Sequence, residues 1–383
     1  MNILFDSQAF DLQTHGGISR CFAQLYKRMP SSINCKIGVK ETNNVYLQSL
    51  GFKKKGELYR NFLIKGLFPG KGQIFELIYN KILNYDYWFN YNRNYCIKLL
   101  TDGKYDVFHP TFYNDYFLKY LNKKKPFVLT IHDMIHELYP QYYSSNDIHI
   151  LAKRKLASQA NAIIAVSNNT KEDIIRILKV PEKKIHVIYH GKTFPDHLIY
   201  NECPFPFKYI LYIGDRTNYK NFISFVKHSS PFFIKHPDIK IICSGKTFSI
   251  EEITLLKNLH VYDQYIQLFV KDDIELANLY HHAICFVYPS EYEGFGIPIL
   301  EAYQTDCIAM LNKKSCFPEI AENAAIFFII QKDFSNIIEK LEYVIHLSPE
   351  KKQQHLLLQK KQLEKYSWDK SVNELITVYK QIV

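Results

Sequence analysis

Short apolar runs recur along the chain and alternate with longer segments whose apolar residues return every three or four positions. Continuous apolar runs are typical of parallel strands buried on both faces of a sheet, and the wider spacing is typical of amphipathic helices. The strands expected from this pattern are residues 2–5, 35–39, 106–109, 127–131 and 162–166 in the first half, and 209–214, 239–243, 265–269, 283–288 and 307–310 in the second half. This alternation predicts an α/β protein made of two doubly wound domains.

The domain boundaries follow from length and from a break in the pattern. A chain of 383 residues is long for one hydrophobic core and suits two domains. The periodicity stops in a proline-containing stretch before the second set of strands, as expected of a linker. We therefore predict a first domain at residues 1–195, a linker at 196–207, a second domain at 208–366 and a terminal helix at 367–383.

The most informative stretch, residues 289–301, reads Pro-Ser-Glu-Tyr-Glu-Gly-Phe-Gly-Ile-Pro-Ile-Leu-Glu. A strand that ends near Tyr288 must turn sharply here, and a helix is expected to start at about Pro298. Proline suits the first helical turn, because its missing N–H would have no partner inside the helix.

The turn leaves a row of free backbone N–H groups at Gly294, Phe295 and Gly296. Free amides at the positive end of a helix form an anion site, so the turn is a candidate phosphate site. The carboxylates of Glu293 and Glu301 flank it. An ordinary strand-to-helix turn would also fit a lone Gly-x-Gly.

Two cations follow the first strand of the second domain. Arg216 and Lys220 stand four residues apart, between a buried strand and a helix. There they can converge on a diphosphate, the arginine through a bidentate fork and the lysine as a point charge. Cations that merely face solvent are the alternative.

The first domain offers candidates at two strand ends. Gly16 and Gly17 follow the first strand and open a helix, which fits either a phosphate or sugar site or a plain helix start. His132 follows another buried strand. Because ligands gather beyond the carboxyl ends of parallel strands, we expect His132 to face the site. His109 has a similar position and is a weaker candidate than His132.

Composition limits the choice of partners. With 47% hydrophobic and 22% charged residues, the chain has the composition of a globular protein. Its formal charge of +10 favours anionic partners, which include nucleotide-sugars, anionic lipids and nucleic acids. No nucleic-acid-binding signature accompanies the basic residues, so no nucleic acid is expected. No two of the 8 cysteines are spaced as a Cys-x-x-Cys pair. We therefore expect the cysteines to be buried thiols of a protein in a reducing compartment.

Location follows from what the sequence lacks. The sequence does not open with the basic residues of a signal peptide, and it has no apolar run near the roughly 18 residues that span a bilayer. A cytoplasmic location is therefore expected. Residues 52–72 interleave basic with bulky apolar side chains, as in a surface helix on an anionic membrane. That helix would place the protein at the inner face of the plasma membrane. The same pattern also fits an ordinary helix with a solvated charged face.

Several strings together resemble a known family. Residues 289–302 resemble the Glu-x7-Glu signature of family 4 retaining glycosyltransferases, and residues 214–221 resemble the family's Gly-x-Arg-x-x-x-Lys-Asn. Residues 315–320 resemble its Ser-Ser-Leu-Pro-Glu-Val. The chain departs from the family at Asp306, which falls near a position where glycine is usual, and at Glu322, which replaces the first residue of Gly-Asp-Ala-Ala. The resemblance implies the GT-B fold, in which two Rossmann-like domains face each other across a cleft and the C-terminal helix crosses back to the first domain.

The resemblance also implies an activity. The expected enzyme is a retaining, metal-independent hexosyltransferase that moves a sugar from a nucleoside diphosphate sugar to a glycan or lipid-linked glycan acceptor. Bacterial cell-surface polysaccharide, such as O-antigen, capsule or lipopolysaccharide, is the expected product. No cofactor is expected beyond the nucleotide-sugar co-substrate, because no paired Asp-x-Asp cation site occupies the cleft motifs.

The family's functional residues map onto this sequence. By resemblance, Glu301 binds the donor ribose hydroxyls, Glu293 holds hydroxyls of the transferred sugar, and Arg216 and Lys220 contact the diphosphate. His132 matches the family's cleft-facing histidine, and the glycine loop at residues 16–17 faces the donor from the first domain. The expected catalytic residues are Glu293, His132, Arg216 and Lys220. The expected donor-binding residues are Gly16, Gly17, Arg216, Lys220, Gly294, Phe295, Gly296 and Glu301.

Two other classes of function remain open from the sequence. A sugar-nucleotide epimerase or a glycan phosphorylase could use a similar fold and donor site. A non-catalytic protein that binds anionic membrane or nucleic acid would use the net charge alone.

Overall fold

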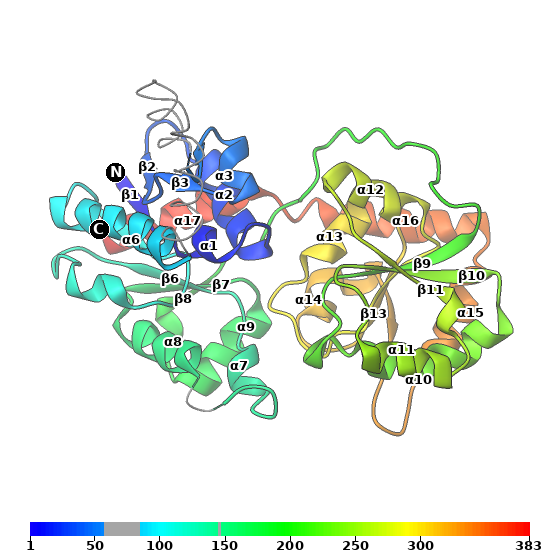
Figure 1. Ribbon diagram of the computed structural model, residues 1–383. Coiled ribbons are helices and arrows are strands. Elements are labelled where there is room, and N and C mark those ends of the chain that lie inside the picture. Colours follow the sequence, from blue (N-terminus) through cyan, green and yellow to red (C-terminus); the bar gives the residue numbers. More distant parts are fainter. Residues whose placement is uncertain (57–84, 145–146) are drawn as a thin grey trace, which may run out of the picture.

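The structure is a computed structural model that describes residues 1–56, 85–144 and 147–383. Two α/β units lie side by side, one running from blue to green along the chain and the other from green to orange (Figure 1). Strands form the centre of each unit, and helices cover them. Within the described ranges, no helix is long and apolar enough to cross a membrane.

The N-terminal unit contains parallel strands in the order β2-β1-β5 and β6-β7-β8. A parallel bridge between Phe108 and Phe127 joins β5 to β6. The strands are β1 (Asn2–Phe5), β2 (Asn34–Ile37), β5 (Val107–His109), β6 (Val128–Ile131), β7 (Ala162–Ala165) and β8 (Ile185–Val187), with a separate pair of β3 (Glu41–Thr42) and β4 (Lys53–Lys54).

The C-terminal unit contains one parallel sheet in the order β11-β10-β9-β12-β13-β14. Its strands are β9 (Lys208–Ile213), β10 (Ile239–Ser244), β11 (Tyr265–Leu268), β12 (Phe286–Tyr288), β13 (Ala309–Asn312) and β14 (Ile326–Phe328). This is the 3-2-1-4-5-6 strand order of dinucleotide-binding domains, which reverses between β9 and β12. Ligands of such sheets bind beyond the carboxyl ends of the strands at that reversal.

Helices cover both sheets. Those of the N-terminal unit are α1 (Gln8–Leu12), α2 (Gly17–Lys27), α3 (Val45–Ser49), α6 (Tyr85–Asp102), α7 (Ile135–Leu138), α8 (Ile148–Gln159) and α9 (Asn168–Asp173). Those that follow are α10 (Phe222–Lys235), α11 (Ile250–Asn258), α12 (Asp273–His282), α13 (Ile297–Gln304), α14 (Phe317–Ala321), α15 (Ile337–Ile345), α16 (Pro349–Leu363) and α17 (Trp368–Ile382).

Burial on both faces explains the apolar strands. In β9, Tyr209 and Leu211 belong to one hydrophobic cluster, while Ile210 and Tyr212 belong to the cluster on the opposite face. Successive side chains of a strand point to opposite faces, so a strand covered on both sides needs apolar residues at every position.

The last helix, α17, returns to the N-terminal unit (Figure 1). Trp368 and Tyr379 are buried in that unit's core. The Trp368 indole N–H donates to the Lys192 carbonyl oxygen at 2.7 Å, and the Tyr379 hydroxyl lies 2.6 Å from His109 Nδ1. The two units are therefore connected by two chain crossings.

The predicted class of two Rossmann-like units with a returning helix is confirmed. Strand β14 was not expected, and α13 begins one residue before Pro298. Strand β8 of the N-terminal unit ends at Val187, and strand β9 of the C-terminal unit begins at Lys208, so the predicted linker lies between these two strands. The exact domain boundaries stay a prediction. Most of the expected membrane segment, residues 57–72, lies outside the described residues.

Two of the sequence's departures from the family have left-handed backbone. Asp306 has a φ of 56° and Glu322 a φ of 46°. Only glycine adopts this region without strain, which accounts for the family's preference for glycine there.

Candidate active site

The loop between β12 and α13 forms one wall of the site. Gly296 has a φ of 87°, and a Cβ there would lie 3.0 Å from Ile299 Cδ1, so the position favours glycine. The backbone amides of residues 294–296 donate to no group in the described part of the chain. They lie at the N-terminus of α13, where the helix dipole is positive. The loop can therefore donate several hydrogen bonds to an anion.

Lys220 and Glu293 meet beside this loop. Lys220 Nζ donates to Glu293 Oε1 at 2.7 Å, and both side chains are largely buried. Ser315 fixes the loop, because its hydroxyl donates to the Glu293 carbonyl oxygen at 2.8 Å. Lys220 follows β9 and Glu293 follows β12, so the pair lies at the strand-order reversal, where ligands are expected.

Arg216 is held more tightly than the sequence suggested. Its Nε donates to Glu252 Oε1 at 2.9 Å, and its Nη2 donates to the carbonyl oxygens of Lys246 and Thr247 at 2.6 and 2.9 Å. One edge of the guanidinium fork is thus used inside the protein. Only Nη1 has no hydrogen bond to a described residue, so Arg216 can offer one nitrogen to a phosphate rather than a bidentate fork.

The N-terminal unit closes onto the loop at Gly294. A Cβ on this residue would lie 1.7 Å from the His132 carbonyl oxygen, so the two backbones approach as closely as glycine permits. Ser167 and Thr170, at the start of α9, donate to the Gly294 carbonyl oxygen at 2.6 and 3.3 Å. The approach brings His132 and the loop together.

His132 is buried, and its Nε2 has no hydrogen-bond partner in the described ranges of the chain. Burial, with a smaller effect from the positive charge of Lys153, lowers the pKa of His132 to about 3. The imidazole is therefore neutral near pH 7. Both ring nitrogens of His109 are occupied inside the protein, because Nδ1 lies 2.6 Å from the Tyr379 hydroxyl and Nε2 lies 2.8 Å from the Thr130 hydroxyl.

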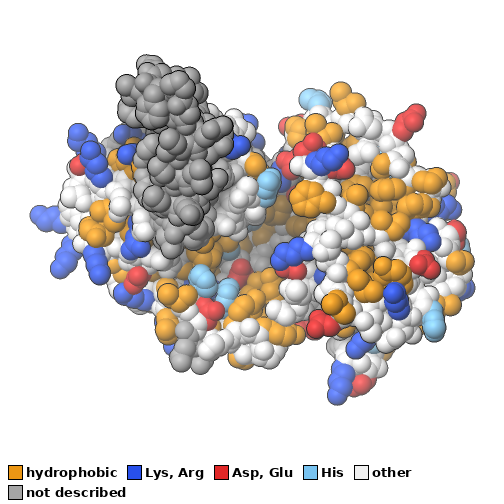
Figure 2. Space-filling model, viewed as in Figure 1, with side chains coloured by type: hydrophobic (Ala, Val, Ile, Leu, Met, Phe, Trp, Pro, Cys, Tyr) orange, Lys and Arg blue, Asp and Glu red, His pale blue; other side chains and the backbone are white. Residues whose placement is uncertain are grey.

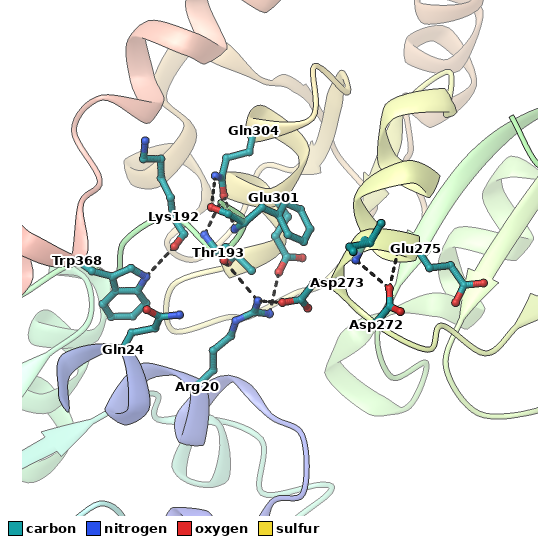
Figure 3. Close-up of polar contacts among 12 residues, drawn as sticks. Arg20, Gln24, Lys192, Thr193, Asp272, Asp273, Glu275, Glu301, Gln304 and Trp368 are labelled. Atoms are coloured by element: carbon teal, nitrogen blue, oxygen red, sulfur yellow. Dashed lines mark hydrogen bonds and ion pairs between the residues drawn. The ribbon is translucent and has the colours of Figure 1, made fainter. Parts of the chain in front are cut away.

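Glu301 lies opposite α2 of the N-terminal unit (Figure 3). Its Oε2 accepts a hydrogen bond from the Tyr280 hydroxyl at 3.2 Å, and its Oε1 lies 3.8 Å from Arg20 Nη1. Burial raises the pKa of Glu301, and Arg20 opposes that shift. Arg20 also forms an ion pair with Asp273.

The glycine loop lies across from α13. A Cβ on Gly17 would lie 3.6 Å from Ile297 Cδ1, so this residue faces the start of α13. A Cβ on Gly16 would meet Gln13 of its own unit instead. Figure 2 shows a hollow between the two units with charged and histidine side chains at its rim. In the described ranges, no group of three or more histidine, cysteine or carboxylate side chains could hold a metal ion.

Two family models match the chain. The model described as Glycosyltransferase Family 4 matches residues 60–191, and the model described as Glycosyl transferases group 1 matches residues 204–381. The chain belongs to the family 4 glycosyltransferases.

Relatives and solved structures agree with the family. The glycosyltransferase is 27% identical over 197 residues to the O-antigen chain mannosyltransferase RfbU of Salmonella typhimurium, a match that covers 50% of this chain and 55% of that protein. It is 28% identical over 304 residues to an uncharacterized glycosyltransferase of Methanocaldococcus jannaschii, covering 74% and 77%. The structure of Anabaena HepE in complex with UDP and glucose covers 100% of this chain and 98% of its own, with 15% identity and a TM-score of 0.65. These likenesses confirm the expected GT-B fold.

Sequence reasoning about this glycosyltransferase missed the groups that join its two units. Glu319 of α14 accepts hydrogen bonds from the backbone N–H groups of Asn168 and Asn169 at 2.7 and 3.0 Å, and from the Tyr189 hydroxyl at 2.8 Å. The resemblance of residues 315–320 to a family string was the only signal. Arg20 was also missed, although it follows the predicted glycine loop.

Proposed function

We propose that this glycosyltransferase moves a sugar from a nucleoside diphosphate sugar to a glycan acceptor, with retention of anomeric configuration and without a metal ion. The proposal rests chiefly on one observation: the free amides of Gly294, Phe295 and Gly296 lie beside Lys220 at the strand-order reversal. Amides and a cation gathered at such a place suit a diphosphate.

The same groups would assist bond breaking. As the bond between the sugar and the diphosphate breaks, negative charge grows on the leaving phosphate. Preorganised amides, Lys220 and Arg216 Nη1 would stabilise that charge, which is where fixed donors lower a barrier most. Glu293, held by Lys220 at 2.7 Å, would accept hydrogen bonds from hydroxyls of the transferred sugar.

The acceptor would attack from the face on which the leaving group departs. The leaving phosphate oxygen would take the proton of the acceptor hydroxyl as the new bond forms. His132, neutral because burial lowers its pKa to about 3, would orient the sugar by a hydrogen bond from or to Nε2 rather than by charge. This route needs no enzyme carboxylate as a nucleophile, so Glu293 remains free to bind hydroxyls.

The printed functions of relatives guide the choice of acceptor. RfbU is named as an O-antigen chain mannosyltransferase, so we propose a cell-surface glycan, free or lipid-linked, as the acceptor. Such a role would place the enzyme on the cytoplasmic side of the membrane. Contact with the membrane through residues 52–72 stays part of the proposal.

Thermal-shift screening against nucleoside diphosphate sugars tests the proposal, because a ligand that binds the folded state raises the unfolding temperature. We expect one donor to stabilise the wild-type protein and Lys220→Ala to weaken that effect. An epimerase would change the donor sugar without an acceptor, which incubation with donor alone detects. Failure of every donor to bind would exclude the proposal.

A further inference from the structure

Arg20 crosses from the N-terminal unit into the C-terminal unit (Figure 3). It lies in the first turns of α2, directly after the glycine loop, and its side chain is 10% exposed. Its Nη2 contacts Asp273 and lies 3.5 Å from the Thr193 carbonyl oxygen. These contacts fix the guanidinium opposite Glu301.

The guanidinium nevertheless has donors to spare. Arg20 Nε is buried and has no hydrogen-bond partner among the residues that the structure describes. Arg20 Nη1 lies 3.8 Å from Glu301 Oε1, beyond hydrogen-bond length. Leaving a buried charged donor unsatisfied is costly, so these atoms point to a ligand group that accepts from Arg20 and donates to Glu301.

The local charge selects the kind of group. Glu301 and Asp273 together carry more negative charge than Arg20 balances. A phosphate would therefore be repelled here. A hydroxyl is neutral, accepts from a guanidinium and donates to a carboxylate, and so can bridge Arg20 and Glu301 by a hydrogen bond to each.

We infer that Arg20 and Glu301 together form a site for the donor's ribose hydroxyls that spans both domains, with Arg20 as a specificity-determining residue. The inference rests on the proposed function and on the ribose-binding role of Glu301 that the family resemblance implies. It adds that the N-terminal domain contributes half of the ribose site. Asp273 holds Arg20 in position for this contact.

The test compares ribonucleoside diphosphates with their 2′-deoxy forms. Dissociation constants for UDP, GDP and ADP and for dUDP, dGDP and dADP are measured by calorimetry, so that hydroxyls of a donor sugar are absent. A hydrogen bond to a charged group corresponds to about a tenfold to hundredfold change in dissociation constant. We expect the wild-type protein to prefer the ribose form by that margin.

The variants isolate Arg20. Arg20→Ala and Arg20→Lys are expected to weaken binding of the ribose form alone, so that the preference falls toward onefold. Arg20→Lys keeps the charge beside Asp273 and guards against loss of the fold, which thermal unfolding monitors. Asp273→Asn should reduce the preference partly. Arg28→Ala, at the other end of α2 and 3.5 Å from Asp369, is the matched control and should keep the preference.

The outcomes separate the two claims. If the wild-type protein prefers ribose and both Arg20 variants keep that preference, the inference is overturned and the proposed function stands. Equal weakening of both forms by Arg20→Lys also overturns it, because that result shows a general effect on the cleft. If the wild-type protein binds no nucleoside diphosphate, the proposed function and the inference fail together.

Discussion

Gly294→Ala is the sharpest perturbation of the closed cleft. The added Cβ would lie 1.7 Å from the His132 carbonyl oxygen, and real Cβ contacts essentially never fall under 3.0 Å. The obstructing atom belongs to backbone, so no rotamer change can relieve the overlap. The two units would have to separate by more than about 1 Å, a displacement that can cost about a hundredfold in rate when it misplaces reacting groups.

The expected result is a fall in kcat of about a hundredfold with each unit still folded. Steady-state transfer kinetics measure the rate, and circular dichroism with thermal unfolding monitors the fold. Gly51→Ala is the control, because Gly51 has a φ of 87° and no atom within 4 Å of its Cβ position. That variant should lose stability through backbone strain and keep its activity. Transfer by Gly294→Ala within threefold of the wild-type rate would refute the reasoning.

Four further predictions follow from contacts of the described residues. Lys220→Ala and Glu293→Ala should each strongly reduce transfer, and the double variant should lose less than the two effects combined, because the side chains form one ion pair; additive losses in a double-mutant cycle would contradict this. Glu319→Ala should lower the free energy of unfolding in urea by about 0.5–1.5 kcal/mol, because it removes the hydrogen bonds from the backbone N–H groups of Asn168 and Asn169, and an unchanged midpoint would argue against the contact. Glu322→Gly should raise the melting temperature, since its φ of 46° and ψ of −127° cost a non-glycine residue about 1–3 kcal/mol; a lower temperature would be the contrary result. Burial lowers the pKa values of His109, His132 and His190 to about 3, below the unfolded value of 6.5. The stability that they contribute is therefore full above pH 6.5 and should fall as the pH drops toward 3, which urea titrations at several pH values measure.

Much of the fold was accessible from the sequence because both sheets are parallel and covered on two faces. Strands such as β9 and β6 read as continuous apolar runs, and the strand-turn-helix at Gly296 is marked by glycine and proline. Strand β14 was missed, although Ile326–Phe328 lie within a continuous apolar run, residues 324–330, of the kind that predicts a buried strand.

The site was predicted where its residues are neighbours in sequence. The amides before α13 and the acids around them lie in one short string. Glu301 is far along the chain from Arg20, and only tertiary packing brings their side chains within 3.8 Å. Likewise, nothing local shows that Glu252 on α11 uses one edge of the Arg216 fork. Long-range polar pairs of this kind leave no periodicity for sequence reasoning to detect.

The central claim is transfer of a sugar from a nucleoside diphosphate donor. The most direct measurement incubates the protein with isotopically labelled nucleoside diphosphate sugars and cell-surface glycan acceptors, and follows label in the glycan and the anomeric configuration of the new bond by NMR. We predict labelled product from one donor, with retained configuration, and strongly reduced product from Lys220→Ala. Folded protein that binds a donor yet transfers no sugar to any glycan, or that transfers it with inversion, would contradict the account.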